Sequence, residues 1–329
     1  MAQTIFRYIV IAALAMPINA VAQPTALVPS GPDLAVPITF GGKRVPVWGG
    51  NGLLVADGPL ASPNIFMAFD REGRQVFGAG FSIAGAYDTR IRGFARGADG
   101  TVAACGISYA GDGRNAPFIS WISADGNSQQ VIRTEPYTAN LITVAPDGTL
   151  WTVGMELNPH GSEDSDVNLD AGVLRHFDRS GKTLGAFMPR SSMQDFTDVA
   201  ATNGRLVAAA DRIGWLHRDY KGQGAYVELS SDGNLASYPL PQLPNLKAAR
   251  VGGLAITDSG DVFAELDNLD VHSFSLYALH RSDRQWLRLK IPASGRWAQL
   301  LGSIGNELAL SYGPGGGLST VHFFAAAKQ

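Results

Sequence analysis

The chain has 329 residues, with 26 basic and 29 acidic side chains and a formal net charge of −3. A mildly acidic chain argues against a general nucleic-acid-binding protein, which presents a basic face. A single cysteine, Cys105, excludes an internal disulfide, so packing must supply the stability.

The N-terminal segment has the layout of a secretory signal peptide. Arg7 is followed by an apolar run over residues 8–16 and by the sequence Ala20-Val21-Ala22, which fits a signal-peptidase site. A transmembrane anchor is disfavoured because the run is shorter than the ~20 residues that a span needs. We therefore predict a cleaved signal peptide over residues 1–22 and a single domain over residues 23–329, periplasmic or secreted, with no membrane insertion after cleavage.

An isolated strand is expected next, over residues 33–40. After it, a turn between two short apolar runs recurs about every 50 residues, with glycines at Gly52, Gly100, Gly148, Gly204, Gly260 and Gly305. A second hairpin falls between these turns, at Gly73, Gly126, Gly181, Gly233 and Ser282-Asp283. Asn-Gly and Asp-Gly dipeptides favour hairpins because both residues adopt positive φ readily.

Each unit thus has four short strands, A to D, and there are six units. The last unit ends after a C strand over residues 319–324, and its missing D strand can come from residues 33–40. Joining the two ends of the chain in one sheet closes a ring and removes an exposed edge. We predict an all-β, six-bladed β-propeller with four antiparallel strands per blade, in which an N-terminal outer strand completes the last blade. Cys105 lies in an apolar strand and is expected to be a buried, inert thiol.

Two hairpins carry a family resemblance. Residues 253–264 resemble the inner hairpin of an NHL repeat, and residues 173–187 resemble its outer hairpin. Residues 144–151 look like a unit of the streptogramin-lyase type of propeller. The resemblance implies the fold. NHL-like propellers serve as binding platforms, and related six-bladed propellers are lactonases, lyases or esterases with a metal at the axis. No blade matches the paired His and Glu motifs of the lyases, so no catalytic residue is carried over.

Loop lengths point to one face of the predicted ring. The A-B and C-D turns are mostly tight, whereas the B-C loops are long. Long loops in compact domains are often functional. We therefore expect the face formed by the B-C and D-A loops to carry the site.

The longest of these loops follows Trp151 and spans residues 156–170. Asp164, Asp166, Asn168 and Asp170 occupy every second position, a spacing at which oxygen ligands can wrap Ca²⁺. The alternative interpretation is a solvated acidic loop without metal.

Basic and aromatic residues are expected near the channel mouth and on neighbouring loops: Arg90, Arg92, Tyr137, Trp215, Arg250 and Trp297. The arginines suit a carboxylate or phosphate, and the aromatic side chains suit a sugar or a peptide. Alternatively, the arginines pair with Asp88, Asp195 or Glu265 and hold blades together, and Trp215 belongs to a packed loop.

Catalysis has only weak candidates. Glu265 and His272 follow a strand of the fifth unit, and His160 lies in the acidic loop; a carboxylate with a histidine can bind a metal or transfer protons. A plain surface loop is the alternative. The leading hypothesis is therefore an exported module that binds a small molecule, glycan or protein on the B-C loop face. The second is a metal-assisted hydrolase or lyase at the axis, acting on a lactone, ester or glycan-derived substrate. The sequence does not decide whether the chain is an enzyme.

Overall fold

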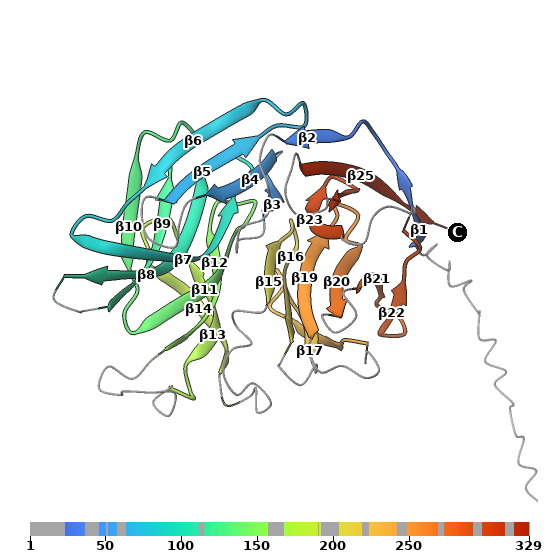
Figure 1. The fold of residues 1–329 in the computed structure, drawn as a ribbon. Helices are drawn as coiled ribbons and strands as arrows, with labels where there is room; N and C mark the ends of the chain where they lie inside the picture. The colour runs from blue at the N-terminus through green and yellow to red at the C-terminus, as the bar shows by residue number, and fades with distance from the viewer. Residues whose placement is uncertain are drawn as a thin grey trace, which may run out of the picture.

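The structure is a computed structural model. It describes residues 24–36, 46–50, 52–57, 64–111, 115–156, 168–189, 191, 204–218, 224–241, 249–268, 273–291, 298–312 and 319–328. Every named element in these residues is a β-strand. The strands form six antiparallel sheets, the blades, arranged in a ring (Figure 1). The six-bladed propeller is confirmed.

Blades 1 to 3 follow one another along the chain, and each has four strands in sequential order. Blade 1 comprises β3 (Val47–Gly49), β4 (Gly52–Asp57), β5 (Asn64–Phe69) and β6 (Gln75–Phe81). Blade 2 comprises β7 (Ala86–Arg96), β8 (Val102–Ala110), β9 (Asn115–Ile122) and β10 (Gln129–Arg133). Blade 3 comprises β11 (Tyr137–Val144), β12 (Leu150–Glu156), β13 (Gly172–Phe177) and β14 (Thr183–Pro189).

Blades 4 and 5 repeat this plan. Blade 4 comprises β15 (Arg205–Ala208), β16 (Arg212–Arg218), β17 (Gly224–Ser230) and β18 (Leu235–Pro239). Blade 5 comprises β19 (Ala249–Ile256), β20 (Val262–Asn268), β21 (Ser273–His280) and β22 (Gln285–Arg288).

Blade 6 joins the two ends of the chain. β23 (Ala298–Ile304), β24 (Glu307–Tyr312) and β25 (Ser319–Lys328) supply three strands. β2 (Leu34–Val36) pairs with residues 319–321 of β25, as predicted for the closing strand. A second segment, β1 (Pro24–Pro29), pairs with residues 324–328 of the same strand, and this pairing was not predicted. Figure 1 shows β1 and β2 following one another along the edge of β25. Because β25 is ten residues long, it has room for both segments.

The predicted turn glycines are largely confirmed. Gly100, Gly148, Gly260 and Gly305 adopt φ values of 85°, 82°, 81° and 58°, which is the conformation that favours glycine at a tight turn. Blade 1 turns at Gly50, with a φ of 54°, and Gly52 begins the next strand.

The prediction that Gly204 forms the A-B turn of blade 4 is wrong. That turn lies at residues 209–211, where the amide of Ala209 donates to the carbonyl oxygen of Arg212. Gly204 instead precedes β15, where a Cβ atom would lie only 2.8 Å from the carbonyl oxygen of Leu216. Glycine is needed there for a close approach between backbones rather than for a turn.

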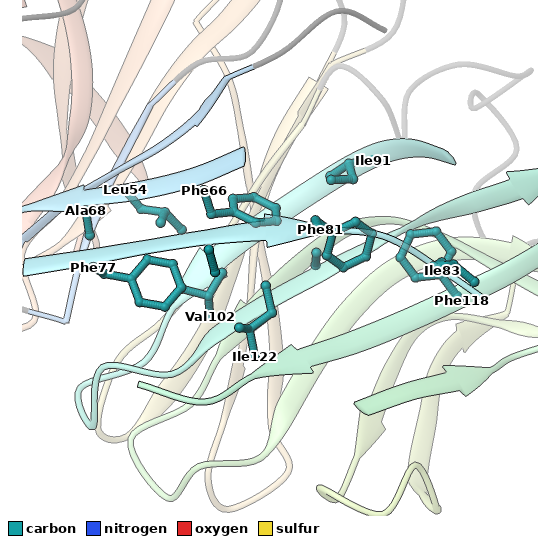
Figure 2. Close-up of a cluster of buried hydrophobic side chains, with 12 residues drawn as sticks. Leu54, Phe66, Ala68, Phe77, Phe81, Ile83, Ile91, Val102, Phe118 and Ile122 are labelled. Atoms are coloured by element: carbon teal, nitrogen blue, oxygen red, sulfur yellow. The ribbon is translucent and has the colours of Figure 1, made fainter. Parts of the chain in front are cut away.

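The hydrophobic core lies at the boundaries between neighbouring blades. Six clusters of buried hydrophobic side chains fill the six boundaries between neighbouring blades. Figure 2 shows the cluster between blades 1 and 2, where the Phe81 ring lies 5.8 Å from that of Phe66 and 5.6 Å from that of Phe118. Both faces of every blade are covered, which explains why the inner strands are apolar on both sides.

Arginines at equivalent turns of blades 1, 3 and 5 reach back to the preceding blade. Arg71 pairs with Glu307 at 2.8 Å and lies over the ring of Phe323. Arg179 pairs with Asp99, and Arg281 pairs with Glu228 at 3.0 Å. Arg71 and Arg179 stand two positions after the last residue of their C strands, and Arg281 stands one position after it. The chain therefore carries a two-blade repeat, in which every odd blade is tied by an arginine to the even blade before it.

Candidate functional site: the axial cavity

The innermost strand of each blade has a neighbour on one side only. The sheet orders place β3, β7, β11, β15, β19 and β23 at the inner edges, and these strands contact one another around the ring. An edge strand leaves part of its backbone N–H and C=O groups without a strand partner. Six such edges therefore surround the axis with hydrogen-bonding backbone.

A cavity of about 620 Å³ lies on this axis. Its wall comes from the A-B turns of the six blades, from the whole of β3 and β15, and from the second half of the other four innermost strands. The volume falls within the range of small-molecule sites, roughly 300–1,000 Å³. Apolar side chains such as Phe94, Ile142 and Leu254 lie farther from the turns, and small residues such as Ala98 and Ala210 lie at the turns. The cavity thus reaches the face on which the A-B turns lie.

The charged groups of the wall differ in how far they are neutralised. Asp211 and Arg212 pair with each other, and Arg212 also reaches Glu228. Arg96 donates through Nη1 to the carbonyl oxygen of Gly50 at 2.9 Å, and its Nε atom is buried without a hydrogen-bond partner among the described residues. Burial holds the pKa of Arg96 below its ordinary value, although nearby Asp99 opposes this effect.

Arg205 and Asp258 are the remaining charged residues of the wall, and Arg205 lies at the start of β15, away from the turn, where it donates to the carbonyl oxygen of Gly204. Asp258 lies at the A-B turn of blade 5. It is exposed, and no described residue makes a hydrogen bond or an ion pair with its carboxylate. Arg96 belongs to blade 2 and Asp258 to blade 5, which are three blades apart in either direction around the ring of six. The cavity therefore has an unneutralised cation and an unneutralised anion on opposite walls.

A buried acid lies close to the deep part of the cavity. Glu265 in β20 is 1% exposed and accepts a hydrogen bond from the backbone amide of Leu300, which lines the cavity. Burial, together with the neighbouring carboxylate of Asp267, holds the pKa of Glu265 well above its ordinary value. The Arg205 guanidinium has the opposite, smaller effect. Glu265 is not among the residues of the cavity wall.

The arginines expected at the channel mouth contact their own protein. Arg90 is largely exposed, pairs with Asp88 at 3.4 Å and lies over the ring of Tyr109. Arg92 donates to Oδ1 of Asn140 across the boundary between blades 2 and 3. The Arg92–Asn140 bond therefore joins two blades, whereas Arg90 and Asp88 both lie in β7, so their pair joins none. Arg250 lies in β19 opposite Asp267.

Tyr137 and Trp215 lie in the core and not on a loop. The hydroxyl of Tyr137 bonds to Thr152 at 3.0 Å and to the carbonyl oxygen of Val173 at 3.1 Å, and the residue is fully buried. Trp215 is 1% exposed, because the displaced A-B turn of blade 4 places it on strand β16. Neither side chain is accessible for direct contact with a ligand in this structure. Burial also raises the pKa of the Cys105 thiol to about 12, as expected for an inert cysteine.

The remaining predicted site residues are only partly described. His160, Asp164, Asp166, His272 and Trp297 lie outside the described residues. Asn168 and Asp170 are exposed at the end of the acidic loop, where Oδ1 of Asn168 accepts a hydrogen bond from the amide of Asp170. Calcium binding by this loop stays a prediction.

The described residues contain neither a cluster of metal-ligating side chains nor a membrane-spanning helix. Among the described residues, no three His, Cys, Asp or Glu side chains come together as a metal site would require. In the same part of the chain, no helix is long and apolar enough to span a membrane. All six B-C loops lie wholly or mainly outside the described residues, so the predicted importance of the B-C face also stays a prediction.

Comparison with known proteins assigns the chain to no family. No known protein family matches the sequence, and no curated protein matches it. Solved structures do match. Kuenenia stuttgartiensis hydrazine synthase is 10% identical over 91% of this chain and 95% of its own, with a TM-score of 0.42. TolB from Acinetobacter baumannii is 11% identical over 83% of this chain and 62% of its own, with a TM-score of 0.43. The β-propeller domain of the trilobed protease from Pyrococcus furiosus is 11% identical over 69% of this chain and 64% of its own, also at 0.43.

Proposed function

We propose that this chain is an exported propeller that binds a small polar molecule in its axial cavity. The observation that carries the proposal is the cavity itself, with a wall drawn from all six blades. Backbone edges supply both donors and acceptors, and apolar side chains supply contact area. A wall of this kind suits recognition of a polar organic molecule without requiring a catalytic group.

Two sequence features support the same role. The NHL-like hairpins accord with a binding platform. The predicted cleavage after Ala22 falls just before β1, which begins at Pro24, so removal of residues 1–22 leaves both closing segments in the mature chain. Expression with the native N-terminus is expected to yield a protein in the envelope fraction or the medium that begins at Gln23. Intact mass and N-terminal sequencing check this, and an uncleaved cytoplasmic product contradicts export.

A pair of tryptophan substitutions tests the cavity. Ala98 lies in the cavity wall and is exposed at its turn, so Ala98→Trp fills the opening. Ala124 is an exposed alanine of the same blade outside the wall, so Ala124→Trp is the matched control. Both variants and the native protein are screened by thermal shift against sugars, amino acids, short peptides and organic acids.

At least one class of compound is expected to raise the melting temperature of the native protein and of Ala124→Trp, but not that of Ala98→Trp. Equal stabilisation of both variants would place binding elsewhere. The B-C loop face, where a protein or glycan partner is predicted, would then become the next candidate. A screen without any stabilising compound would count against a small-molecule function.

A further inference from the structure

The charges of the cavity wall and its backbone edges, taken together, restrict the class of ligand. Asp211 and Arg212 neutralise each other, and Arg205 lies at the far end of β15, away from the turns, where it donates to the carbonyl oxygen of Gly204. Arg96 and Asp258 are then the charged groups of the wall near the turns for which the described residues supply no ion pair. A ligand that neutralises both must carry a negative and a positive group. Because the two residues belong to opposite blades, the charges of the ligand must be separated by the width of the cavity.

Arg96 is suited to a carboxylate. Its guanidinium lies at the turns, where Nη1 is bound to the carbonyl oxygen of Gly50 and Nε is buried out of reach of a ligand. Nη2 makes no hydrogen bond with a described residue, so the Nη1–Nη2 end of the guanidinium is the part that can meet a carboxylate. Nearby Asp99 does not neutralise it, since Asp99 pairs with Arg179 and accepts a hydrogen bond from Thr101. A guanidinium binds planar carboxylates through paired N–H groups.

Asp258 is suited to an ammonium group. Its backbone is anchored, because its amide donates to the carbonyl oxygen of Gly305 at 2.9 Å in the next blade. The carboxylate is left facing solvent at the turn. An ammonium group there gains a charge-assisted hydrogen bond without displacing a partner from the described part of the protein.

The wall between these two residues consists of strand edges. A peptide that spans from Arg96 to Asp258 crosses the axis along which these strands run, so its N–H and C=O groups meet the unpaired backbone groups of the edges one at a time and not as an added strand. A free α-amino acid carries its ammonium and carboxylate groups on the same carbon atom and so cannot reach both walls, whereas a neutral sugar lacks the charges. A peptide of a few residues has opposite charges at its two ends and the hydrogen-bonding groups between them.

We propose that the axial cavity binds a short peptide with free ends, with its α-carboxylate on Arg96 and its α-ammonium group on Asp258. This inference rests on the proposed function, because it assigns a ligand class to the same cavity. The side chains of the peptide face the small and apolar residues of the wall, so the ends and the backbone dominate recognition.

Isothermal titration calorimetry with trialanine and tetraalanine tests the proposal on the mature protein. Each peptide is compared with its N-acetylated and its C-amidated form, which lack one charge each. We expect each blocked peptide to bind at least tenfold more weakly than the free one. Because these comparisons use the native protein, they remain informative even if a variant fails to fold.

Two variants test which residue of the cavity wall binds which end of the peptide. In Asp258→Asn, N-acetylation should no longer weaken binding, and in Arg96→Gln, C-amidation should no longer weaken it, as in a double-mutant cycle. Asp147→Asn is the matched control, because Asp147 occupies an A-B turn of blade 3 but is not part of the cavity wall. It should retain both effects.

Two outcomes overturn the inference: equal binding of free and blocked peptides, and no peptide binding at millimolar concentration. If some other compound binds and Ala98→Trp abolishes that binding, the proposed function stands and only the ligand class is wrong. If Ala98→Trp affects no ligand, both proposals fail.

Discussion

Arg281 of blade 5 and Glu228 of blade 4 join their blades through two parallel hydrogen bonds. Nε donates to Oε1 at 3.1 Å and Nη2 donates to Oε2 at 3.0 Å. The same carboxylate accepts the hydroxyls of Tyr226 and Tyr238, each at 3.1 Å, and lies 3.4 Å from Arg212. Glu228 is 8% exposed, so this network replaces the water that the carboxylate loses on folding.

Removal of Arg281 should therefore destabilise the protein clearly. Arg281→Met keeps most of the side-chain volume but leaves Glu228 with fewer charged donors. We expect a loss of about 2 to 3 kcal/mol, since removal of one partner of a largely buried pair leaves an incompletely compensated charge. Urea unfolding measures it. A loss below about 0.5 kcal/mol would show that Arg212 and the tyrosines suffice.

The hydrogen bonds of Glu228 also predict that the stability of the folded protein depends on pH in the acid range. Burial raises the pKa of Glu228, but the hydrogen bonds and charges of Arg281 and Arg212 outweigh this effect and hold the pKa below its ordinary value. A lowered pKa in the folded state stabilises the protein above the unfolded pKa, and this stability is lost as the pH falls below about 4.5. Glu228→Gln should therefore show a shallower fall in melting temperature between pH 5 and pH 3. Parallel curves for the two proteins would contradict the assignment.

The three arginines of the two-blade repeat should differ in importance. Arg179 and Asp99 are 53% and 44% exposed, whereas Arg71 and Glu307 are 32% and 25% exposed. Exposed pairs contribute little because water screens them. We expect Arg179→Met to cost about 0.5 kcal/mol, Arg71→Met about 1 kcal/mol, and Arg281→Met the most. Urea unfolding of the three variants under one set of conditions tests the order, and a larger loss for Arg179→Met than for Arg281→Met would refute it.

Glu265 should respond to pH in the opposite sense to Glu228. Burial beside Asp267 raises its pKa, so the folded state retains a proton that the unfolded chain releases above about pH 4.5. Its contribution to stability is present below that pH and declines as the pH rises toward the folded-state pKa.

Glu265→Gln removes this decline, because the amide stays neutral and its oxygen can still accept from Leu300. The variant should gain melting temperature relative to the native protein as the pH rises from 5 to 8. Glu135→Gln changes an exposed carboxylate in the connection between blades 2 and 3 and serves as the control. A difference between native and Glu265→Gln proteins that does not vary with pH would contradict the prediction.

Substitution of Gly253 on an inner strand tests how closely neighbouring inner strands approach each other, and Gly80 on the outer strand β6 is the comparison. A Cβ atom on Gly253 would lie 2.2 Å from the carbonyl oxygen of Leu300 in the next blade, so Gly253→Ala must displace backbone. We expect a loss of about 2 kcal/mol or more. Gly80 in β6 has no atom within 4 Å of such a position, so Gly80→Ala should be neutral or stabilise by about 0.5 kcal/mol. Similar losses for both variants would mean that the crowding at Gly253 is relieved easily.

The sequence alone determined the number of blades, the strands of most blades and the closure of the ring. These features depend on local chemistry, since an Asp-Gly turn between apolar runs forms a hairpin wherever it occurs. Thus Gly100, Gly148 and Gly260 were placed correctly, and residues 34–36 were matched to the last blade. Gly204 was misassigned because a glycine required for close approach has the same local sequence as a turn glycine.

The tertiary structure decided which side chains meet. The sequence-based prediction placed Trp215 on a loop, because it put the A-B turn of blade 4 at Gly204. Trp215 lies on strand β16 and is buried in the core. Arg96 and Asp258 carried no local signal, because they are 162 positions apart, one at the end of an ordinary strand and the other in an ordinary turn. Only closure of six blades around one axis places them on opposite walls of a cavity, since that relationship depends on the geometry of the ring and not on either residue's neighbours in the chain.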